Sequence, residues 1–299
     1  MISMLKINFY VCVSKFTNKT VKCINSIINQ SHIHKTRIYI IDNSLRSNIK
    51  KNIEKKIIYK KNVSINILIE KKRGIPFARN RCLKIIRKTK TDFTCFIDDD
   101  CELSKVWLKN MLKVYEETKS DIITGPQISK SKNIYENILE RKNKHLKKIK
   151  WAATNNVFMN SKVLKKNKIN FDTQLKKLGG SDQVFFSKLS EKGLIIIWNE
   201  KSKVYENRDQ KKTNLIWFIK RNMRYGSSSK ILYLKIFRPF KAYLLFFAKF
   251  ISEFLRSLLY LVIIPVSIKK HSLISLQYII RATATLLSLF NFKFEEYKD

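Results

Sequence analysis

The sequence lacks the features that mark several common classes of protein. It has five cysteines with no CxxC spacing, and no zinc-finger, helix-turn-helix or RNP-like pattern. We therefore expect no disulfide framework, and nucleic acid is not the expected partner. Several cysteines fall in apolar strand or helix contexts, which is typical of free thiols in a reducing compartment. The opening stretch MISMLKINFYVCV has no apolar region followed by small residues, so we expect no signal peptide.

Acidic residues are also scarce. The 299 residues include 61 Lys and Arg against 23 Asp and Glu, a formal net charge of +38. Such an excess favours anionic partners: a membrane surface, nucleic acid or a phosphorylated substrate. The lysines are scattered along the chain, and Asn and Ile are abundant with them. An AT-rich genome would produce this composition, so part of the charge needs no functional explanation.

Strand and helix patterns alternate over the first 123 residues. The expected strands are residues 7–13, 37–41, 63–69 and 93–97. The expected helices are residues 18–29, 76–87 and 105–118, the first capped by Asn18 or Thr20. This order predicts an α/β fold with a doubly wound, mostly parallel sheet and helices on both faces. Ligands of such sheets bind at the carboxyl ends of the strands.

Three adjacent carboxylates follow the strand at 93–97, in the stretch FIDDDC. They are Asp98, Asp99 and Asp100. Neighbouring carboxylates repel one another unless a cation or solvent neutralises them. Mg²⁺ takes one or two carboxylates and completes its shell with water and substrate phosphate oxygens. The pattern favours a metal site, and a solvated acidic turn is the alternative.

The chain after residue 130 is less regular. Residues 130–150 are polar and predict a helix or a mobile loop, and short strands are expected within 151–160, 194–198 and 203–206. The glycine pair before Ser181 and Asp182 precedes an apolar helical pattern, with Ser181 as its expected cap. Residues 213–225 predict an amphipathic helix.

The carboxyl-terminal region is apolar and basic. A first apolar run, residues 242–266, is interrupted by three charged residues on one helical face: Lys249, Glu253 and Arg256. A second run, residues 273–292, contains only Arg281 as a charge. A membrane-spanning helix needs about 20 apolar residues with few charges. A helix pair in the membrane interface fits better, with true spans or an ordinary helical subdomain as alternatives.

Several ordered stretches carry a resemblance to a known family. They are NQS at 29–31, IIDNS at 40–44, GIPFARN at 74–80, FIDDDC, TGP at 124–126, TNNVFMN at 154–160, GGSDQVFF at 179–186 and IKRNMRYG at 219–226. Together the chain resembles the inverting, nucleotide-sugar-dependent glycosyltransferases of family 2, of the type that builds bacterial cell-surface glycans. The resemblance implies a GT-A domain over residues 1–226. It leaves residues 227–299 as a membrane-associated helical extension.

The resemblance assigns donor-binding roles to residues at the strand ends. Asp42 would accept a hydrogen bond from the imide N–H of the nucleotide base, although a strand-end Asp often bonds its own turn. Arg79 and Asn80 would hold the sugar or the diphosphate, although polar residues at helix starts are often only caps. These three residues are the expected contacts with the nucleotide-sugar donor.

The same resemblance assigns a Mg²⁺ or Mn²⁺ ion to the FIDDDC stretch. Asp100 would ligate the cation, Asp98 would contact the ribose or metal-bound water, and Asp99 is the less certain substrate-binding member. Relatives commonly place a His after a later strand as a further metal ligand. This chain has Glu206 there, which would bind the metal or pair with Arg208.

Transfer with inversion needs a base for the attacking hydroxyl, and Asp182 stands at the position of that base. Helix capping is the alternative role of Asp182. Relatives commonly have Glu before the base, whereas this chain has Ser181. Arg221 and Arg224 would neutralise the diphosphate, unless they form a solvated basic face. The QxxRW pattern of processive synthases is absent, which favours transfer of a single sugar.

These features predict a glycosyltransferase at the cytoplasmic face of the cell membrane, acting on a glycan or lipid-linked acceptor and held by anionic lipid. Asp42, Asp100 and Asp182 should then line one cleft. A sugar nucleotidyltransferase is one alternative, but VCVSKFTNKT lacks the glycines of that class. A non-catalytic basic protein that binds membrane or nucleic acid is the other.

Overall fold

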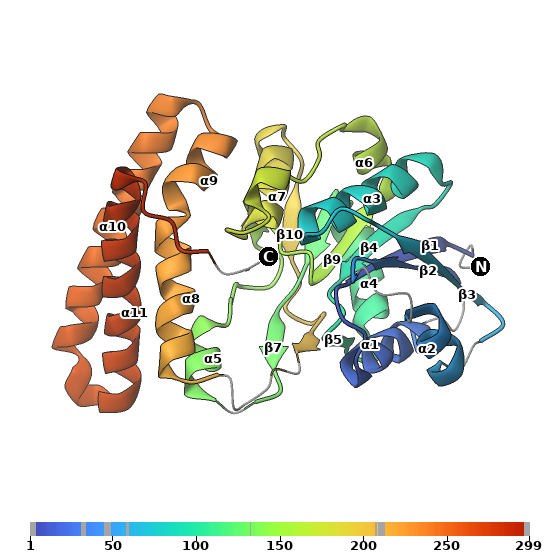
Figure 1. Cartoon of the computed structure of the whole chain (residues 1–299), viewed down its shortest axis with the longest axis horizontal. Coiled ribbons are helices and arrows are strands. Elements are labelled where there is room, and N and C mark those ends of the chain that lie inside the picture. The colour runs from blue at the N-terminus through green and yellow to red at the C-terminus, as the bar shows by residue number, and fades with distance from the viewer. Residues whose placement is uncertain are drawn as a thin grey trace. The chain divides into compact units, whose positions relative to one another are not determined.

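The computed structural model describes residues 4–30, 34–44, 49–57, 60–131, 133–206, 208 and 213–295. It divides into two compact units, which we describe separately (Figure 1). Unit 1 consists of Met1–Lys130, Glu140–Thr173 and Phe185–Asn207. Unit 2 consists of Ser131–Leu139, Gln174–Val184 and Arg208–Asp299. The domain boundary expected after residue 226 stays a prediction, because compactness alone does not show which segment folds independently.

Unit 1 is built on an eight-stranded sheet with the order β3-β2-β1-β4-β9-β6-β10-β8. The strands are β1 (Lys6–Val13), β2 (Lys35–Asp42), β3 (Val63–Ile69), β4 (Phe93–Ile97), β6 (Ile122–Thr124), β8 (Lys148–Ile149), β9 (Asn156–Asn160) and β10 (Ile196–Trp198). Strands β1 to β4 pair in parallel, whereas β9 runs antiparallel to both β4 and β6. The expected α/β fold with a mostly parallel sheet is confirmed.

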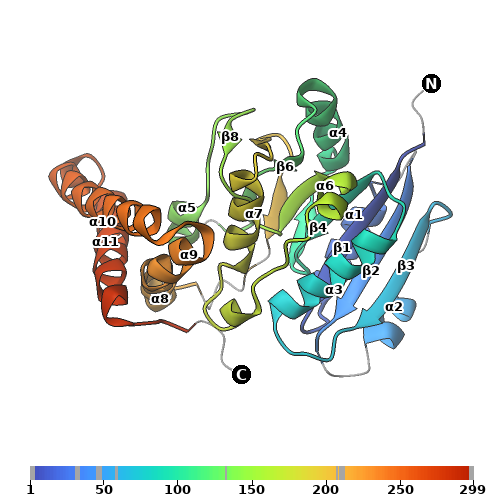
Figure 2. The same cartoon turned by 90° about the horizontal axis from the view of Figure 1, so that it is seen from above.

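Helices cover both faces of this sheet (Figure 1). One face carries α1 (Asn18–Ile28), α2 (Ile49–Lys56) and α4 (Trp107–Thr118). The other carries α3 (Ile75–Lys88), α6 (Ser161–Lys166) and the later part of α7 (Ser181–Glu191). Viewed from above, α3 lies along β1 and β2 (Figure 2). Alternate residues of β1 enter the two cores, Phe9 on the α1 side and Tyr10 on the α3 side, as the two-residue period of a strand requires.

A second sheet of three short strands continues from the end of β4. It contains β5 (Cys101–Leu103), β11 (Val204–Glu206) and β7 (Gln127–Ser129), in the order β5-β11-β7. Strand β11 runs antiparallel to β5, so that Glu206 stands opposite Cys101. The small sheet therefore brings a late glutamate beside the segment that follows the three aspartates.

Two local expectations, for the cap of α1 and for residues 130–150, need correction. The cap of α1 is Thr17: its hydroxyl accepts a hydrogen bond from the Lys19 backbone at 3.2 Å, and the Thr20 side chain accepts one from the Thr17 backbone. This reciprocal capping box explains why Thr20 looked like a cap. The segment at 130–150 is neither one helix nor one loop, because it holds α5 (Ile134–Leu139) and β8.

Gln30, the middle residue of the NQS stretch, connects two helices through its side chain. Gln30 donates from Nε2 to the carbonyl oxygen of Ser104 at 3.0 Å and accepts from the Leu108 backbone at 3.0 Å. These bonds tie the end of α1 to the start of α4. Ser31, the last residue of the stretch, lies outside the described residues.

The described part of unit 2 is helical. It contains α5, α8 (Leu215–Ser227), α9 (Ser229–Ile236), α10 (Pro239–Val262) and α11 (Ile268–Leu287). A Cβ added to Gly226 of α8 would lie 2.4 Å from the carbonyl oxygen of Arg281 and 2.6 Å from Cβ of Ala284. Helices α8 and α11 therefore pack closely only because residue 226 has no side chain. Within the described residues, Ile268–Phe290 alone is long and apolar enough to cross a membrane, and 33% of its most apolar part is buried.

Candidate active site

The three aspartates form a turn between the two sheets of unit 1. The backbone of Cys101 donates to the carbonyl oxygen of Asp98 at 3.1 Å. The Cys23 thiol of α1 donates to the same oxygen at 3.4 Å. Asp98, Asp99 and Asp100 are all partly exposed. The fold thus holds three carboxylates together at the carboxyl end of β4, the edge where the sequence predicted a ligand site.

This turn concentrates negative charge. Burial, followed by the charges of Asp100 and Asp98, raises the pKa of Asp99 to about 8. Burial and the same carboxylates also raise the pKa of the Cys23 and Cys101 thiols well above the usual range. A bound cation would relieve this repulsion directly.

Arg79 lies next to these carboxylates. It is 8% exposed, and its Nη2 atom lies 3.6 Å from Oδ1 of Asp98. Its position follows from the start of α3, where Gly74 has φ 124° and Pro76 occupies the first turn. A positive φ of this size favours glycine, and proline is well tolerated at a helix start. The GIPFARN stretch therefore sets the place of Arg79.

The neighbouring Asn80 is held by the backbone of Phe171. Its Nδ2 donates to the Phe171 carbonyl at 2.9 Å, and its Oδ1 accepts from the Phe171 N–H at 2.8 Å. The ring of Phe171 lies 5.7 Å below the guanidinium of Arg79. Asn80 thus supports the segment that packs on Arg79, and its expected contact with the sugar or diphosphate stays a prediction.

Asp42 ends β2 and is 5% exposed. Its Oδ1 accepts hydrogen bonds from the backbone and hydroxyl of Ser44, at 2.8 and 2.6 Å. The turn that the sequence left open as an alternative is therefore present. It fixes the carboxylate through one oxygen, and contact with a nucleotide base stays a prediction.

Sequence reasoning missed the role of Asn43. Its side chain donates to the carbonyl oxygens of Glu70 and Lys72 and accepts from the Gly74 backbone, at 2.8 to 2.9 Å. These bonds join the end of β2 to the end of β3 and the start of α3. An Asn after a strand is a signal for such a turn, but its partners lie about 30 residues away and cannot be read from local pattern.

Glu206 is 8% exposed and accepts a hydrogen bond from Gln127 Nε2 at 2.8 Å. Gln127 also contacts the Cys101 thiol and accepts a hydrogen bond from the Asn155 side chain. The sequence did not indicate this role of Gln127. Arg208, the alternative partner of Glu206, belongs to unit 2, where its Nε lies 3.8 Å from Oε1 of Glu136.

A divalent metal would find a partial set of ligands here. Among the described residues, no group of three or more His, Cys, Asp or Glu side chains is arranged to hold a metal ion. The crowded carboxylates at 98–100 still offer the one or two oxygen ligands that Mg²⁺ usually takes from protein. The ligand set therefore fits an ion that shares its shell with substrate phosphates.

The remaining expected site residues belong to unit 2. Asp182 lies in the first turn of α7, where its Oδ1 accepts from the Gln183 backbone at 2.8 Å. Ser181 is the first helical residue and not the cap before it. Gly179 and Gly180 both have positive φ, 74° and 77°. The expectation that Asp42, Asp100 and Asp182 line one cleft stays a prediction, with Asp42 and Asp100 in unit 1 and Asp182 in unit 2.

Arg221 and Arg224 gather with Arg281 around the ring of Tyr225. Their guanidinium carbons lie 5.5, 4.8 and 5.0 Å from the ring centre, and Arg221 Nε donates to the Tyr225 hydroxyl at 3.2 Å. Burial alone would raise the pKa of Tyr225, but the three guanidiniums lower it to about 8. This cluster is strongly electropositive, and its contact with a diphosphate stays a prediction.

Comparison with known proteins agrees with this architecture. The family model described as glycosyl transferase family 2 matches residues 17–176, more than half of the chain. No curated protein matches the chain.

Three solved structures show the likeness of the fold. The S. aureus protein TarS 1–349 in complex with UDP-GlcNAc has a TM-score of 0.56 at 14% identity, over 77% of this chain and 66% of that one. The mannosyltransferase PcManGT from Pyrobaculum calidifontis, in complex with GDP-Man and Mn²⁺, has a TM-score of 0.65 at 11% identity, over 98% and 89%. GalNAc-T7 with UDP, GalNAc and Mn²⁺ has a TM-score of 0.56 at 12% identity, over 77% and 51%. In another TarS 1–349 structure, this chain spans 65% of the length.

Proposed function

Because the chain belongs to glycosyl transferase family 2, we propose that it transfers one sugar from a nucleotide diphosphate donor to an acceptor hydroxyl. The observation that carries the proposal is the group of carboxylates at the end of β4, with Arg79 at 3.6 Å from Asp98. A carboxylate group and a buried guanidinium at one strand end suit a diphosphate that arrives with a divalent cation. The neighbours solved with UDP-GlcNAc or with GDP-Man and Mn²⁺ support the same donor class.

The donor would be held at the carboxyl edge of the parallel strands. Asp42 accepts the imide N–H of the base, and its bonds to Ser44 keep the carboxylate in one orientation. Arg79 pairs with the diphosphate by charge-assisted hydrogen bonds. Asn80 and Asp99 complete the sugar and diphosphate contacts.

Asp100 and Asp98 would hold the Mg²⁺ or Mn²⁺ ion, with Glu206 as a further ligand. The bound ion supplies Lewis-acid stabilisation of the leaving nucleoside diphosphate. The chain's own contribution is the crowding of carboxylates, which disfavours the metal-free state.

Asp182 would act as the base. Its carboxylate takes the proton of the acceptor hydroxyl while the hydroxyl oxygen attacks the anomeric carbon and the bond to the diphosphate breaks, so that the configuration inverts. The amino end of α7 favours a negative charge at this position. Arg221 and Arg224 would neutralise the departing diphosphate.

The acceptor would be a glycan or a lipid-linked sugar at the cytoplasmic face of the membrane, in the synthesis of a cell-surface polysaccharide. The large excess of basic residues favours a location beside an anionic membrane surface over a location beside a neutral one. The lack of QxxRW favours addition of a single sugar over processive synthesis.

Calorimetric titration of UDP, dTDP and GDP, each with and without Mn²⁺, tests the proposal. We expect one nucleotide to bind in a Mn²⁺-dependent manner to the wild type and to lose that binding in Asp100→Ala. Glu117→Ala is the matched control, because it removes an exposed carboxylate of α4 with the same change in charge. Absence of nucleotide binding under both conditions, or equal binding by Asp100→Ala, would rule out this donor site.

A further inference from the structure

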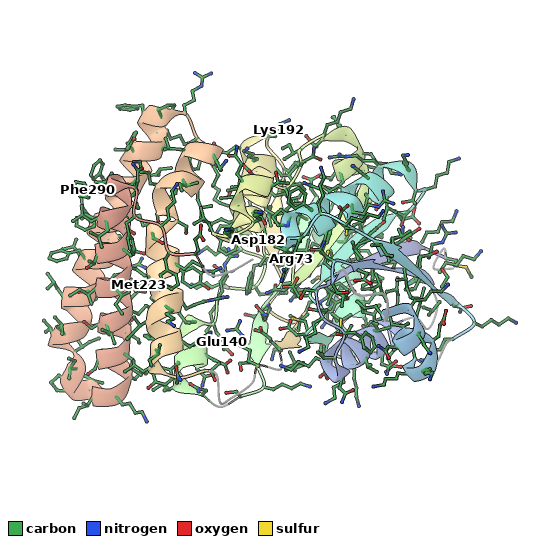
Figure 3. All side chains as sticks on the ribbon, in the orientation of Figure 1. Arg73, Glu140, Asp182, Lys192, Met223 and Phe290 are labelled. Atoms are coloured by element: carbon green, nitrogen blue, oxygen red, sulfur yellow. The ribbon has the colours of Figure 1, made fainter. Side chains whose placement is uncertain are left out.

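The outer surface of α10 is apolar along its whole length. Leu244, Phe247, Ile251, Phe254, Leu255 and Leu258 are all exposed. Their spacing of three and four residues places them in one stripe on the helix. The side chains that project from α10 and α11 on the side away from α8 are mostly carbon (Figure 3). In a water-soluble protein, a helix normally packs such an apolar stripe against the protein core. Here the stripe faces away from the helical bundle.

The interior of the same hairpin contains polar and charged groups beside Phe246 and several alanines. Glu253, Ser257 and Thr285 are buried, at 7%, 0% and 0% exposure. Lys249 Nζ lies 3.6 Å from Glu253 Oε1, and the Thr285 hydroxyl donates to Glu253 Oε2 at 3.3 Å. Of the three charges that interrupt the apolar run in the sequence, Lys249 and Glu253 therefore point into the bundle, whereas Arg256 is exposed. Small and polar residues inside and large apolar residues outside are typical of helices packed in lipid.

The charge of this region matches an anionic surface. Residues 227–299 have eleven Lys or Arg residues and four acidic residues, and of the acidic ones only the buried Glu253 lies on α10 or α11. Exposed basic residues lie at the starts of the two helices, Arg238 and Lys241 on α10 and Lys269 and Lys270 on α11. Because the helices pack side by side across a short turn, these groups stand at opposite ends of the stripe (Figure 1).

We propose that the α10–α11 hairpin binds an anionic phospholipid bilayer and lies in its plane. The apolar stripe enters the boundary between headgroups and acyl chains, and the basic ends contact the headgroups. Arg256, which is exposed and stacks over the Tyr278 ring at 5.6 Å, reaches the headgroup level from the side of the stripe. The proposal concerns attachment only and does not depend on the transfer reaction.

The packing of α8 decides between lying in the membrane and crossing it. By length and composition, Ile268–Phe290 could span a bilayer. However, α8 packs on α11 at Gly226 and carries Lys220, Arg221 and Arg224. A transmembrane hairpin would draw these cations toward the hydrocarbon, where charged side chains are costly and rare. A hairpin in the interface keeps α8 on the aqueous side.

A second copy of the chain is a poorer occupant of the stripe. Two hairpins facing each other would bring their basic ends together with no described exposed carboxylate on α10 or α11 to pair with them. Like charges at an interface oppose association, whereas anionic headgroups neutralise them. The charge pattern therefore selects lipid over self-association.

Vesicle flotation of the full chain tests the surface. We expect binding to phosphatidylcholine vesicles that contain phosphatidylglycerol and little binding to phosphatidylcholine alone. Leu255→Glu should weaken partitioning about tenfold, because it removes one buried leucine and adds a negative charge. Ile69→Glu on β3 is the matched control: Ile69 is 60% exposed against 57% for Leu255, and the charge change is identical. Equal losses in the two variants, or no binding by the wild type, would overturn the proposal.

Alkaline carbonate extraction of the loaded vesicles tests the orientation. An interfacial hairpin should be released, whereas retention in the membrane would show that it spans. Sedimentation of the lipid-free protein provides the last control, since a stable dimer that no longer binds vesicles would assign the stripe to self-association. Nucleotide titration in solution stays independent of all three results, so a failure here leaves the proposed transfer reaction intact.

Discussion

Unit 1 and the α10–α11 hairpin of unit 2 place their side chains by opposite rules. In unit 1 the large apolar groups, such as Trp107 and Phe158, are buried, and the acidic residues of the candidate site follow strand ends. In the hairpin Glu253 and Thr285 are buried while Phe240 is 85% exposed. One chain therefore contains a part whose large apolar side chains form a core and a part whose large apolar side chains are mostly exposed.

The difference lies in what stabilises each part. Burial of apolar surface drives the folding of unit 1, because its core removes that surface from water. The hairpin has a narrow interior of hydrogen bonds and small residues, such as the bond from Ser275 Oγ to the Ser257 carbonyl at 2.9 Å. Phe246 of α10 is buried, at 1% exposure, but the exposed large apolar residues contribute only when another surface covers them. Each prediction below tests one side of this contrast.

The largest difference should appear between two Phe→Ala variants. Phe158 is 1% exposed and stacks on Phe93 at 4.5 Å, so Phe158→Ala should lower the free energy of unfolding by about 3–5 kcal/mol. Phe240→Ala on α10 should change it by less than about 0.5 kcal/mol, because the side chain is already in solvent. Urea unfolding without lipid measures both. Similar losses in the two variants would show that the hairpin has an ordinary core.

The buried ion pair of the hairpin gives the next effect. Glu253→Ala leaves Lys249 without its carboxylate in a largely buried position, which should cost about 3 kcal/mol. The double variant Lys249→Met and Glu253→Leu should recover most of this loss, because apolar groups of similar size often replace a buried pair at little cost.

Calorimetric thermal unfolding compares the two forms. A double variant as unstable as Glu253→Ala would mean that the hydrogen bonds to Thr285 and Ser229 matter more than the removal of an unpaired charge.

The sequence alone was a good guide where the pattern was long. The strands at 63–69 and 93–97 have the observed bounds, because β-branched and aromatic runs of that length fit few other structures. Helix α2 was missed, because Ile49 and Ile53 are its only buried residues, and β5, with three residues, is too short to show a period. Short elements form through tertiary contacts that no local window contains.

For the candidate site, the sequence located the acidic turn but not what supports it. The three aspartates follow β4 as the pattern required. The bonds from Asn43 to Glu70 and Lys72 join segments that are distant in sequence. Helical spacing likewise predicted that Lys249, Glu253 and Arg256 share a face, but Lys249 and Glu253 pair inside the bundle whereas Arg256 is exposed. Which way that face points depends on partners in α11, and only the packed structure supplies them.

The smallest effect concerns the cationic cluster of unit 2. The guanidiniums of Arg221, Arg224 and Arg281 outweigh burial and lower the pKa of Tyr225 to about 8, from a usual value of about 10. The folded form then releases this proton at a lower pH than the unfolded form. The stabilisation that results is complete above about pH 10 and is lost as the pH falls through about 8.

An absorbance titration of tyrosinate checks this directly, because one tyrosine should ionise near pH 8 in the wild type and none should do so in Tyr225→Phe. Arg281→Met is the second arm, since removing one of the three cations should raise the pKa of Tyr225 toward the usual range. The stability of Tyr225→Phe should then fail to rise between pH 8 and pH 10 as the wild type does. If the wild type shows no ionisation below pH 9, the guanidiniums do not act on the hydroxyl.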